Sequence, residues 1–244
     1  MVKKATEHFI FKNNIFEEMA GTNSRCFKIT INIEKLEFSN ITIKNCPMSY
    51  YTGAFYFVSS SLPYTIEFIE WKFIGNTCNS LLCGGSGIWI SGRYSDIKNF
   101  HFIYRNCLWD SNHAKHDPNI STIGQNGPRP YLHNGCGGAI QIGFTESRAN
   151  IQLTFDECEF KSNTADKEGG ALAIQTTKSC RITNCIFTNN YASTSNGGAI
   201  FIDPDFKNEY VTAARNPNIE ITFSEFNGNT AQDGSALYIT GQSA

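Results

Sequence analysis

The chain is poor in charged residues and has no excess of positive charge. Only 17% of its 244 residues are charged, and 20 Lys and Arg residues against 22 Asp and Glu residues give a formal net charge of −2. Binding to a nucleic-acid backbone requires a basic face on the protein. A nucleic-acid partner is therefore not expected.

Long apolar runs and helical periodicity are missing too. No window reaches the about 18 consecutive apolar residues that a spanning helix needs, and no apolar core of a secretory signal follows Lys3 and Lys4. None of the nine cysteines forms a C-x-x-C pair, which argues against a zinc ribbon. We expect no helical stripe, no signal peptide and no transmembrane segment in this chain, so any membrane association would come from regions outside it.

What the sequence does contain is one repeated cassette, clearest in residues 155–174. Phe is followed three residues later by Asn, and shortly afterwards by Gly-Gly-Ala and an aliphatic residue. The first element stands at Phe73/Asn76, Phe160/Asn163, Phe187/Asn190 and Phe226/Asn229, and with Trp at Trp109/Asn112; the second stands at 137–139, 169–171 and 197–199, with Gly-Ser-Ala at 234–236. Drifted copies begin near residues 11 and 38. Such internal repetition is typical of stacked repeat architectures.

The cassette predicts short strands between tight turns, because segments such as 151–155 and 199–202 are rich in β-branched, aromatic and small residues. Single parallel strands do not bury themselves, so successive coils are expected to stack about 4.8 Å apart. The sequence therefore predicts an all-β parallel β-helix of about seven coils, with residues 1–244 as a single domain. Neither end shows a polar cap, which favours a segment of a longer solenoid.

Equivalent side chains of stacked coils should form ladders inside the solenoid. We expect an aromatic column from the Phe and Trp residues of the cassette, and an amide ladder in which each Asn donates to the next and satisfies backbone carbonyls. The Gly pairs supply positive φ and close approach, while Ala139, Ala171 and Ala199 fit a narrow corner. The cassette residues are thus assigned structural roles.

These motifs, FxxN and GGA followed by an aliphatic residue, resemble the repeat of chlamydial polymorphic outer-membrane proteins, and similar repeats occur in surface proteins of some protists. The resemblance covers residues 60–240 well and the first 60 residues poorly. It implies a right-handed, pectin-lyase-like β-helix at a cell surface or secreted, acting in adhesion or host and immune interaction, with a host cell-surface protein or glycan as partner. We expect neither the secretion signal nor the C-terminal barrel of the bacterial form within these 244 residues.

Three cysteines, Cys107, Cys158 and Cys185, occupy one slot in successive coils. They can pack as reduced, small hydrophobic side chains, or form disulfides between coils, since stacked Cα atoms about 5 Å apart lie inside the bonding range. Cys78 and Cys83 bracket a loop that a disulfide could close. The odd number of cysteines leaves at least one thiol unpaired within this chain.

The longest excursion from the cassette is an inserted loop at residues 113–136, where three prolines and several glycines argue against regular structure. It gathers His113, His116, His133, Asp117 and Cys136, which makes it a candidate metal site. The alternative is a solvated loop in which these residues hold nothing. We expect no metal or cofactor, and interpret the loop as an adhesive or antigenic protrusion on a rigid scaffold.

The competing hypothesis is a polysaccharide lyase or glycoside hydrolase, because pectin-lyase-like β-helices also house such enzymes. Hydrolysis needs two carboxylates about 5–9.5 Å apart. The alignment places Glu159 and Glu225 in one outward slot two coils apart, with Ile186 between them and Leu108 in the preceding coil. Asp156, Asp203 and Asp205 are the remaining candidates, as calcium ligands. Since no carboxylate cleft results, we expect a non-enzymatic protein with no catalytic residues.

Overall fold

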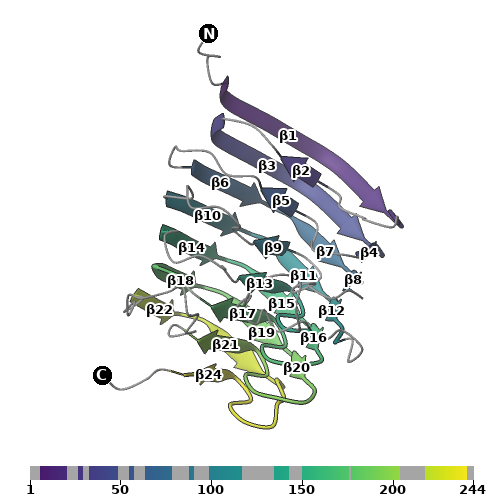
Figure 1. Cartoon of the computed structure of the whole chain (residues 1–244), viewed down its shortest axis with the longest axis vertical. Coiled ribbons are helices and arrows are strands. Elements are labelled where there is room, and N and C mark those ends of the chain that lie inside the picture. The colour runs from purple at the N-terminus through teal and green to yellow at the C-terminus, as the bar shows by residue number, and fades with distance from the viewer. Residues whose placement is uncertain are drawn as a thin grey trace, which may run out of the picture.

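The computed structural model describes residues 6–20, 27–29, 33–48, 55–57, 64–78, 88–90, 99–116, 135–142, 150–175, 177–203 and 218–240. All regular structure in these ranges is β-strand. Every strand pairing among them is parallel. The strands stack coil upon coil along the long axis of the molecule (Figure 1), which confirms the predicted parallel β-helix.

The largest sheet has 12 strands in two limbs that meet at β3. One limb contains β1 (Thr6–Glu17), β3 (Ile33–Lys44), β6 (Tyr64–Ile69), β10 (Asn99–Arg105), β14 (Asn150–Asp156), β18 (Ser179–Thr183) and β22 (Asn218–Thr222). The other contains β7 (Lys72–Ile74), β11 (Leu108–Asp110), β15 (Glu159–Lys161), β19 (Ile186–Thr188) and β23 (Glu225–Asn227).

Shorter sheets form the other walls of the solenoid. One stacks β4 (Pro47–Met48), β8 (Thr77–Cys78), β12 (His113–Ala114), β16 (Thr164–Ala165) and β20 (Tyr191–Ala192). Another stacks β9 (Ile88–Ile90), β13 (Ile140–Ile142), β17 (Leu172–Gln175), β21 (Ile200–Asp203) and β24 (Leu237–Ile239). In addition, β2 (Phe27–Ile29) pairs with β5 (Phe55–Phe57).

The amide ladder is present as predicted. Asn76, Asn112, Asn163 and Asn190 are fully buried or nearly so. In each coil the Nδ2 donates to the Oδ1 of the next Asn and to a strand carbonyl of the preceding coil; for Asn163 these acceptors are Asn190 Oδ1 and Trp109 O, both at 3.0 Å. The Oδ1 of Asn163 in turn accepts from the backbone N–H and the Nδ2 of Asn112. Each amide therefore ties three coils together.

The predicted aromatic column is also present, and runs from Phe73 through Trp109, Phe160 and Phe187 to Phe226. The last three steps have ring centroids 4.6–4.8 Å apart and planes within 4° of parallel. Because that spacing matches the distance between coils, offset-stacked rings fill the interior without interrupting the strand ladder.

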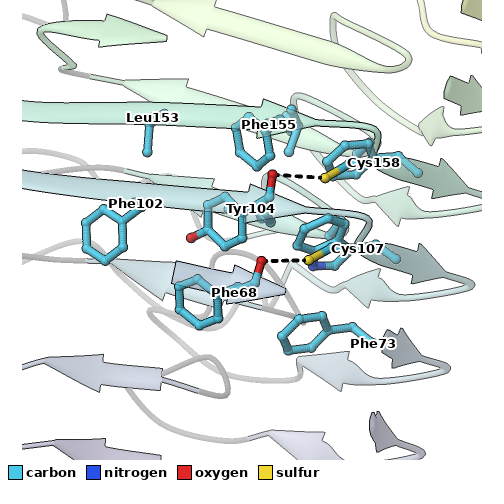
Figure 2. Close-up of a cluster of buried hydrophobic side chains, with 14 of the residues drawn as sticks. Phe68, Phe73, Phe102, Tyr104, Cys107, Leu153, Phe155 and Cys158 are labelled. Carbon is cyan, nitrogen blue, oxygen red and sulfur yellow. Dashed lines mark hydrogen bonds between the residues drawn. The ribbon is translucent and has the colours of Figure 1, made fainter. Parts of the chain in front are cut away.

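A second aromatic column, which the cassette did not predict, runs beside the first. Phe38, Phe68, Tyr104 and Phe155 stack with centroids 5.8, 4.8 and 4.8 Å apart. Figure 2 shows Phe68, Tyr104 and Phe155 of this column next to the thiols of Cys107 and Cys158. These thiols donate to the carbonyls of Phe68 at 3.3 Å and Tyr104 at 3.5 Å.

The thiols of Cys107, Cys158 and Cys185 are buried and free. Burial, followed by the contact with Cys107, raises the pKa of Cys158; the hydrogen bond with Cys158, followed by burial, raises that of Cys185. The raised pKa values support the first of the two alternatives, in which these cysteines pack as neutral, small side chains. Cys78 is disulfide-bonded, and since none of the other described cysteines forms a disulfide, its partner lies outside the described residues.

Candidate functional site

The inserted loop begins later than the sequence indicated. His113 and Ala114 form strand β12, which pairs with β8 and β16, and Ala114 is fully buried. The next residue still donates its N–H to the carbonyl of Cys78 at 3.0 Å. The excursion from the coil thus starts after His116, and residues 117–134 lie outside the described ranges.

The outgoing end of this excursion is held by one carboxylate of the next coil. Asp166 Oδ1 lies 2.8 Å from His113 Nε2, and Asp166 Oδ2 accepts the backbone N–H of His116 at 2.8 Å. The side chains of His113 and Asp166 are each about one-third exposed. Two hydrogen bonds to one carboxylate fix its direction and, through it, the last described residues before the loop.

The returning end is held by the two residues that follow Asp166. The backbone N–H of Lys167 donates to the carbonyl of Gly135 at 2.9 Å, and the Cys136 thiol donates to Glu168 Oε2 at 2.8 Å. Complete burial, followed by the negative charge of Glu168, raises the pKa of Cys136 well above its usual value. Cys136 is therefore a neutral hydrogen-bond donor that anchors this end of the excursion to Glu168.

The two ends meet. Gly135 has φ +82°, and a Cβ on it would lie 2.9 Å from the Cβ of His116 and 3.0 Å from its backbone nitrogen. The following coil supports this base, since Ser193 Oγ donates to the carbonyl of Asp166 at 3.1 Å and Ser195 Oγ to Glu168 Oε1 at 3.2 Å. The described residues on either side of 117–134 are consequently held together at one point of the solenoid, which we call the loop base (His113, His116, Gly135, Cys136 and Asp166–Glu168).

Sequence reasoning found the loop but not its anchor. Asp166 and Glu168 lie 53 and 32 residues from His113 and Cys136, and no motif links them. Of the predicted metal candidates, the structure brings His113 to Asp166 and Cys136 to Glu168, while Asp117 and His133 lie outside the described residues. Within the described ranges there is no group of three potential metal ligands.

The carboxylates considered for hydrolysis stand as the alignment placed them. Glu159, Ile186 and Glu225 occupy one register position on β15, β19 and β23, and Leu108 precedes them on β11. The two glutamates are thus separated by a full coil that carries an exposed isoleucine. Asp203 ends β21 and pairs in register with Gln175, while Asp205 lies outside the described residues.

A polar stripe on the outer face of the large sheet was not predicted. Arg105 and Asp156 lie 3.6 Å apart, Arg181 and Glu220 lie 2.9 Å apart, and His101 Nε2 lies 3.0 Å from Thr154 Oγ1. Burial lowers the pKa of His101, against the opposing charge of Glu67. These contacts join neighbouring strands, and a cross-strand pair of this kind contributes a few tenths of a kcal/mol, up to about 1 kcal/mol.

Comparison with known families supports the repeat. Residues 184–203 match the model of the Chlamydia polymorphic membrane protein repeat. The match contains both cassette elements, Phe187/Asn190 and the Gly-Gly-Ala cluster at 197–199, so the resemblance predicted from the motifs is confirmed at this coil. No curated protein and no solved structure matches the chain. In the described parts of the chain, no helix has the length and apolar character to span a membrane.

Proposed function

We propose that the chain is a non-enzymatic, surface-displayed β-helix scaffold whose loop at residues 117–134 contacts a partner in adhesion or host interaction. The observation that carries the proposal is the loop base: both ends of a long excursion are fixed to three consecutive residues, Asp166–Glu168, of a rigid coil. Binding segments are commonly loops positioned by a rigid scaffold.

The positions of the cassette residues support the same proposal, in which the coils are structural and the segments outside them bind a partner. The Asn, Phe and Ala side chains of the cassette lie inside the solenoid, where they pack and form hydrogen bonds. An outward function then falls to segments that leave the coils. The match to a polymorphic membrane protein repeat supports a surface location. The class of partner that we propose is a host cell-surface protein or glycan.

A polysaccharide-cleaving activity is the alternative, and the spacing of its best carboxylates argues against it. Two coils are about 10 Å deep, which exceeds the 5–9.5 Å range of glycosidase pairs, and Ile186 occupies the position between Glu159 and Glu225.

The test is binding of purified chain to host cells, before and after replacement of residues 117–134 by a short Gly-Ser linker. Because His116 and Gly135 are in contact, such a linker closes the gap without disturbing the coils. We expect binding to be lost while the unfolding midpoint stays the same. Treating the cells with protease or with glycosidases then separates a protein partner from a glycan.

A subtler variant, Asp166→Ala, keeps every loop residue and releases the outgoing end of the loop. We expect weaker binding, because His113 and His116 would no longer be held at the loop base and preorganisation would be lost. Glu225→Ala is the matched control, since it removes an exposed carboxylate at a distance from the loop base. Undiminished binding by the linker variant, or loss of binding in Glu225→Ala, would show that the loop is not the contact surface.

A further inference from the structure

One residue in each described coil has a left-handed backbone conformation at the corner where the two limbs of the large sheet meet. Its φ lies between +50° and +59° at Asn13, Asn40, Glu70, Asn106, Glu157, Asn184 and Phe223. Asparagine is one of the few residues other than glycine that adopt this conformation readily. The backbone alone therefore explains why asparagine recurs at this corner.

The residues two positions after the corner form a ladder on the outer side of the strands. In register order this ladder contains Ile15, Thr42, Lys72, Leu108, Glu159, Ile186 and Glu225. Thr42 is the only one of these residues that carries a hydroxyl. Asn40 is consequently the only corner asparagine that belongs to an Asn-x-Thr triplet, Asn40-Ile41-Thr42, which is an acceptor sequence for N-linked glycosylation.

Asn40 is exposed, and the rest of the triplet holds it at the surface. Ile41 is fully buried, and Thr42 pairs with a neighbouring strand on each side. The Nδ2 of Asn40 donates to Asn13 Oδ1 at 2.9 Å, which is the one hydrogen bond of this side chain among the described residues. An amide nitrogen carries two hydrogens, so the second can be exchanged for a sugar while the contact with Asn13 is kept.

We propose that Asn40 is an N-glycosylation site, modified by a lipid-diphosphate-linked oligosaccharide in the secretory pathway of a eukaryotic cell. Asn40 Nδ2 forms a bond to the anomeric carbon of the first sugar, and the bond from that carbon to the diphosphate oxygen breaks. The lipid diphosphate leaves, and Nδ2 loses one of its two hydrogens as a proton. The transfer needs no oxidant or reductant.

The fold determines when the sugar is added. Because Ile41 lies in the core and Thr42 lies inside a sheet, the triplet cannot bind to an enzyme as a free, extended segment once the coil has closed. The sugar is therefore added before this coil folds, and afterwards it stands outside the corner of β3 (Figure 1). None of the loop-base residues belongs to β3, so the glycan is a feature separate from the loop of the proposed function.

The experiment is peptide mass spectrometry of the full chain, secreted from eukaryotic cells behind a cleavable signal. The second triplet of this type, Asn119-Ile120-Ser121, lies outside the described residues, so Asn119→Gln is introduced into every chain. We expect a glycan on the peptide that contains Asn40, and conversion of this residue to Asp by a peptide N-glycosidase in heavy-oxygen water. An unmodified Asn40 in the secreted chain would overturn the proposal.

Two changes at Thr42 separate the effect of the triplet from that of the corner. Thr42→Val keeps the β-branched shape of the side chain and removes the hydroxyl, so modification of Asn40 should be lost. Thr42→Ser keeps the hydroxyl, so modification should remain. A glycan that persists on Asn40 in Thr42→Val would contradict the proposal. All these chains keep the loop base, and no partner enters the readout, so the result is independent of the binding test above.

A matched pair of variants tests the corner in another coil. Asn184 is exposed at the same corner, and Ile186→Thr supplies a hydroxyl two residues after it. We expect a new glycan on Asn184. Glu159→Thr places a hydroxyl two residues after Glu157, which has no side-chain amide, and should add no glycan. An unmodified Asn40 beside a modified Asn184 would show that the corner accepts a glycan but that Asn40 does not carry one, which would also overturn the proposal.

Discussion

At the scale of the residue, the amide ladder is where the largest effect of a small change is expected. Asn163 is fully buried and uses its side chain for bonds to Trp109, Asn190 and Asn112. Asn163→Ala leaves the carbonyl of Trp109 and the amide of Asn112 without these partners inside the solenoid. We expect a loss of about 1–3 kcal/mol in the free energy of unfolding, from urea titration. Asn227→Ala, on the exposed side of β23, should stay within about 0.5 kcal/mol; equal effects would contradict the ladder.

A second substitution should stabilise the protein. Tyr104 is buried between Phe68 and Phe155, and its hydroxyl has no hydrogen-bond partner among the residues that the structure describes. Tyr104→Phe removes an unsatisfied polar atom with almost no change in shape, so we expect a gain of about 1 kcal/mol or more in unfolding free energy. The same change at the exposed Tyr191 is the control and should be neutral. Destabilisation by Tyr104→Phe would show that the hydroxyl does have a partner.

The buried thiols predict a loss of stability in alkali. Burial raises the pKa of Cys158 and of Cys180 above the ordinary thiol value of 9.0. In that case the folded state keeps protons that the unfolded state releases, so the stabilisation is fully present below pH 9 and is lost as pH rises toward the folded-state values. Each such group contributes a slope of up to about 1.4 kcal/mol per pH unit. Unfolding midpoints that fall less steeply above pH 9 in Cys158→Ala than in the parent chain would support this; parallel curves would refute it.

At the scale of the element, the Gly-Gly-Ala corner sets how closely coils approach. A Cβ on Gly170 would lie 2.5 Å from the backbone nitrogen of Tyr191 and would also collide with the carbonyl oxygen of Gly198. Both obstacles are backbone atoms of the next coil, which cannot move aside without separating the strands.

Gly170→Ala should therefore destabilise the fold by several kcal/mol, or prevent folding. Gly228→Asn is the matched control: its φ is +64°, a side-chain atom of Asn189 is the nearest obstacle, and other coils hold Asn45, Ser111, Ser162 or Asn189 at this turn. Circular dichroism and thermal melts compare the fold and the melting temperature of the two variants. A well-folded Gly170→Ala protein would contradict the close-approach argument.

Features of the fold that depend on spacing within one coil could be predicted from the sequence, whereas features that depend on which coils stack could not. The FxxN spacing places Phe160 and Asn163 on the inside of every coil, so the ladder and the first aromatic column were predictable. The second column was predictable only as apolar, since its members range from Phe155 to Ile182 and Ile221. The loop base was not predictable, because the bonds of Asp166 and Glu168 depend on which coils stack next to each other.

At the scale of the whole molecule, the interior repeats the same ladders from coil to coil, and the segments that differ lie outside the coils. Each coil contacts its neighbours through the same ladders, so stability accumulates along the stack and falls where a neighbour is missing. The strands of the last described rung show this, since β22 is half-exposed or exposed throughout, whereas the equivalent positions of β18 include buried residues.

The measurement that tests this account most directly is hydrogen exchange of the native chain. The backbone N–H groups of Asn112, Asn163 and Asn190 donate to the Oδ1 of the following Asn, and should exchange only through near-global unfolding. We predict slow exchange in peptides covering 99–116 and 150–203 and fast exchange across 218–240. Fast exchange of the three Asn amides, at the rate of the last rung, would contradict a solenoid held together by its interior ladders.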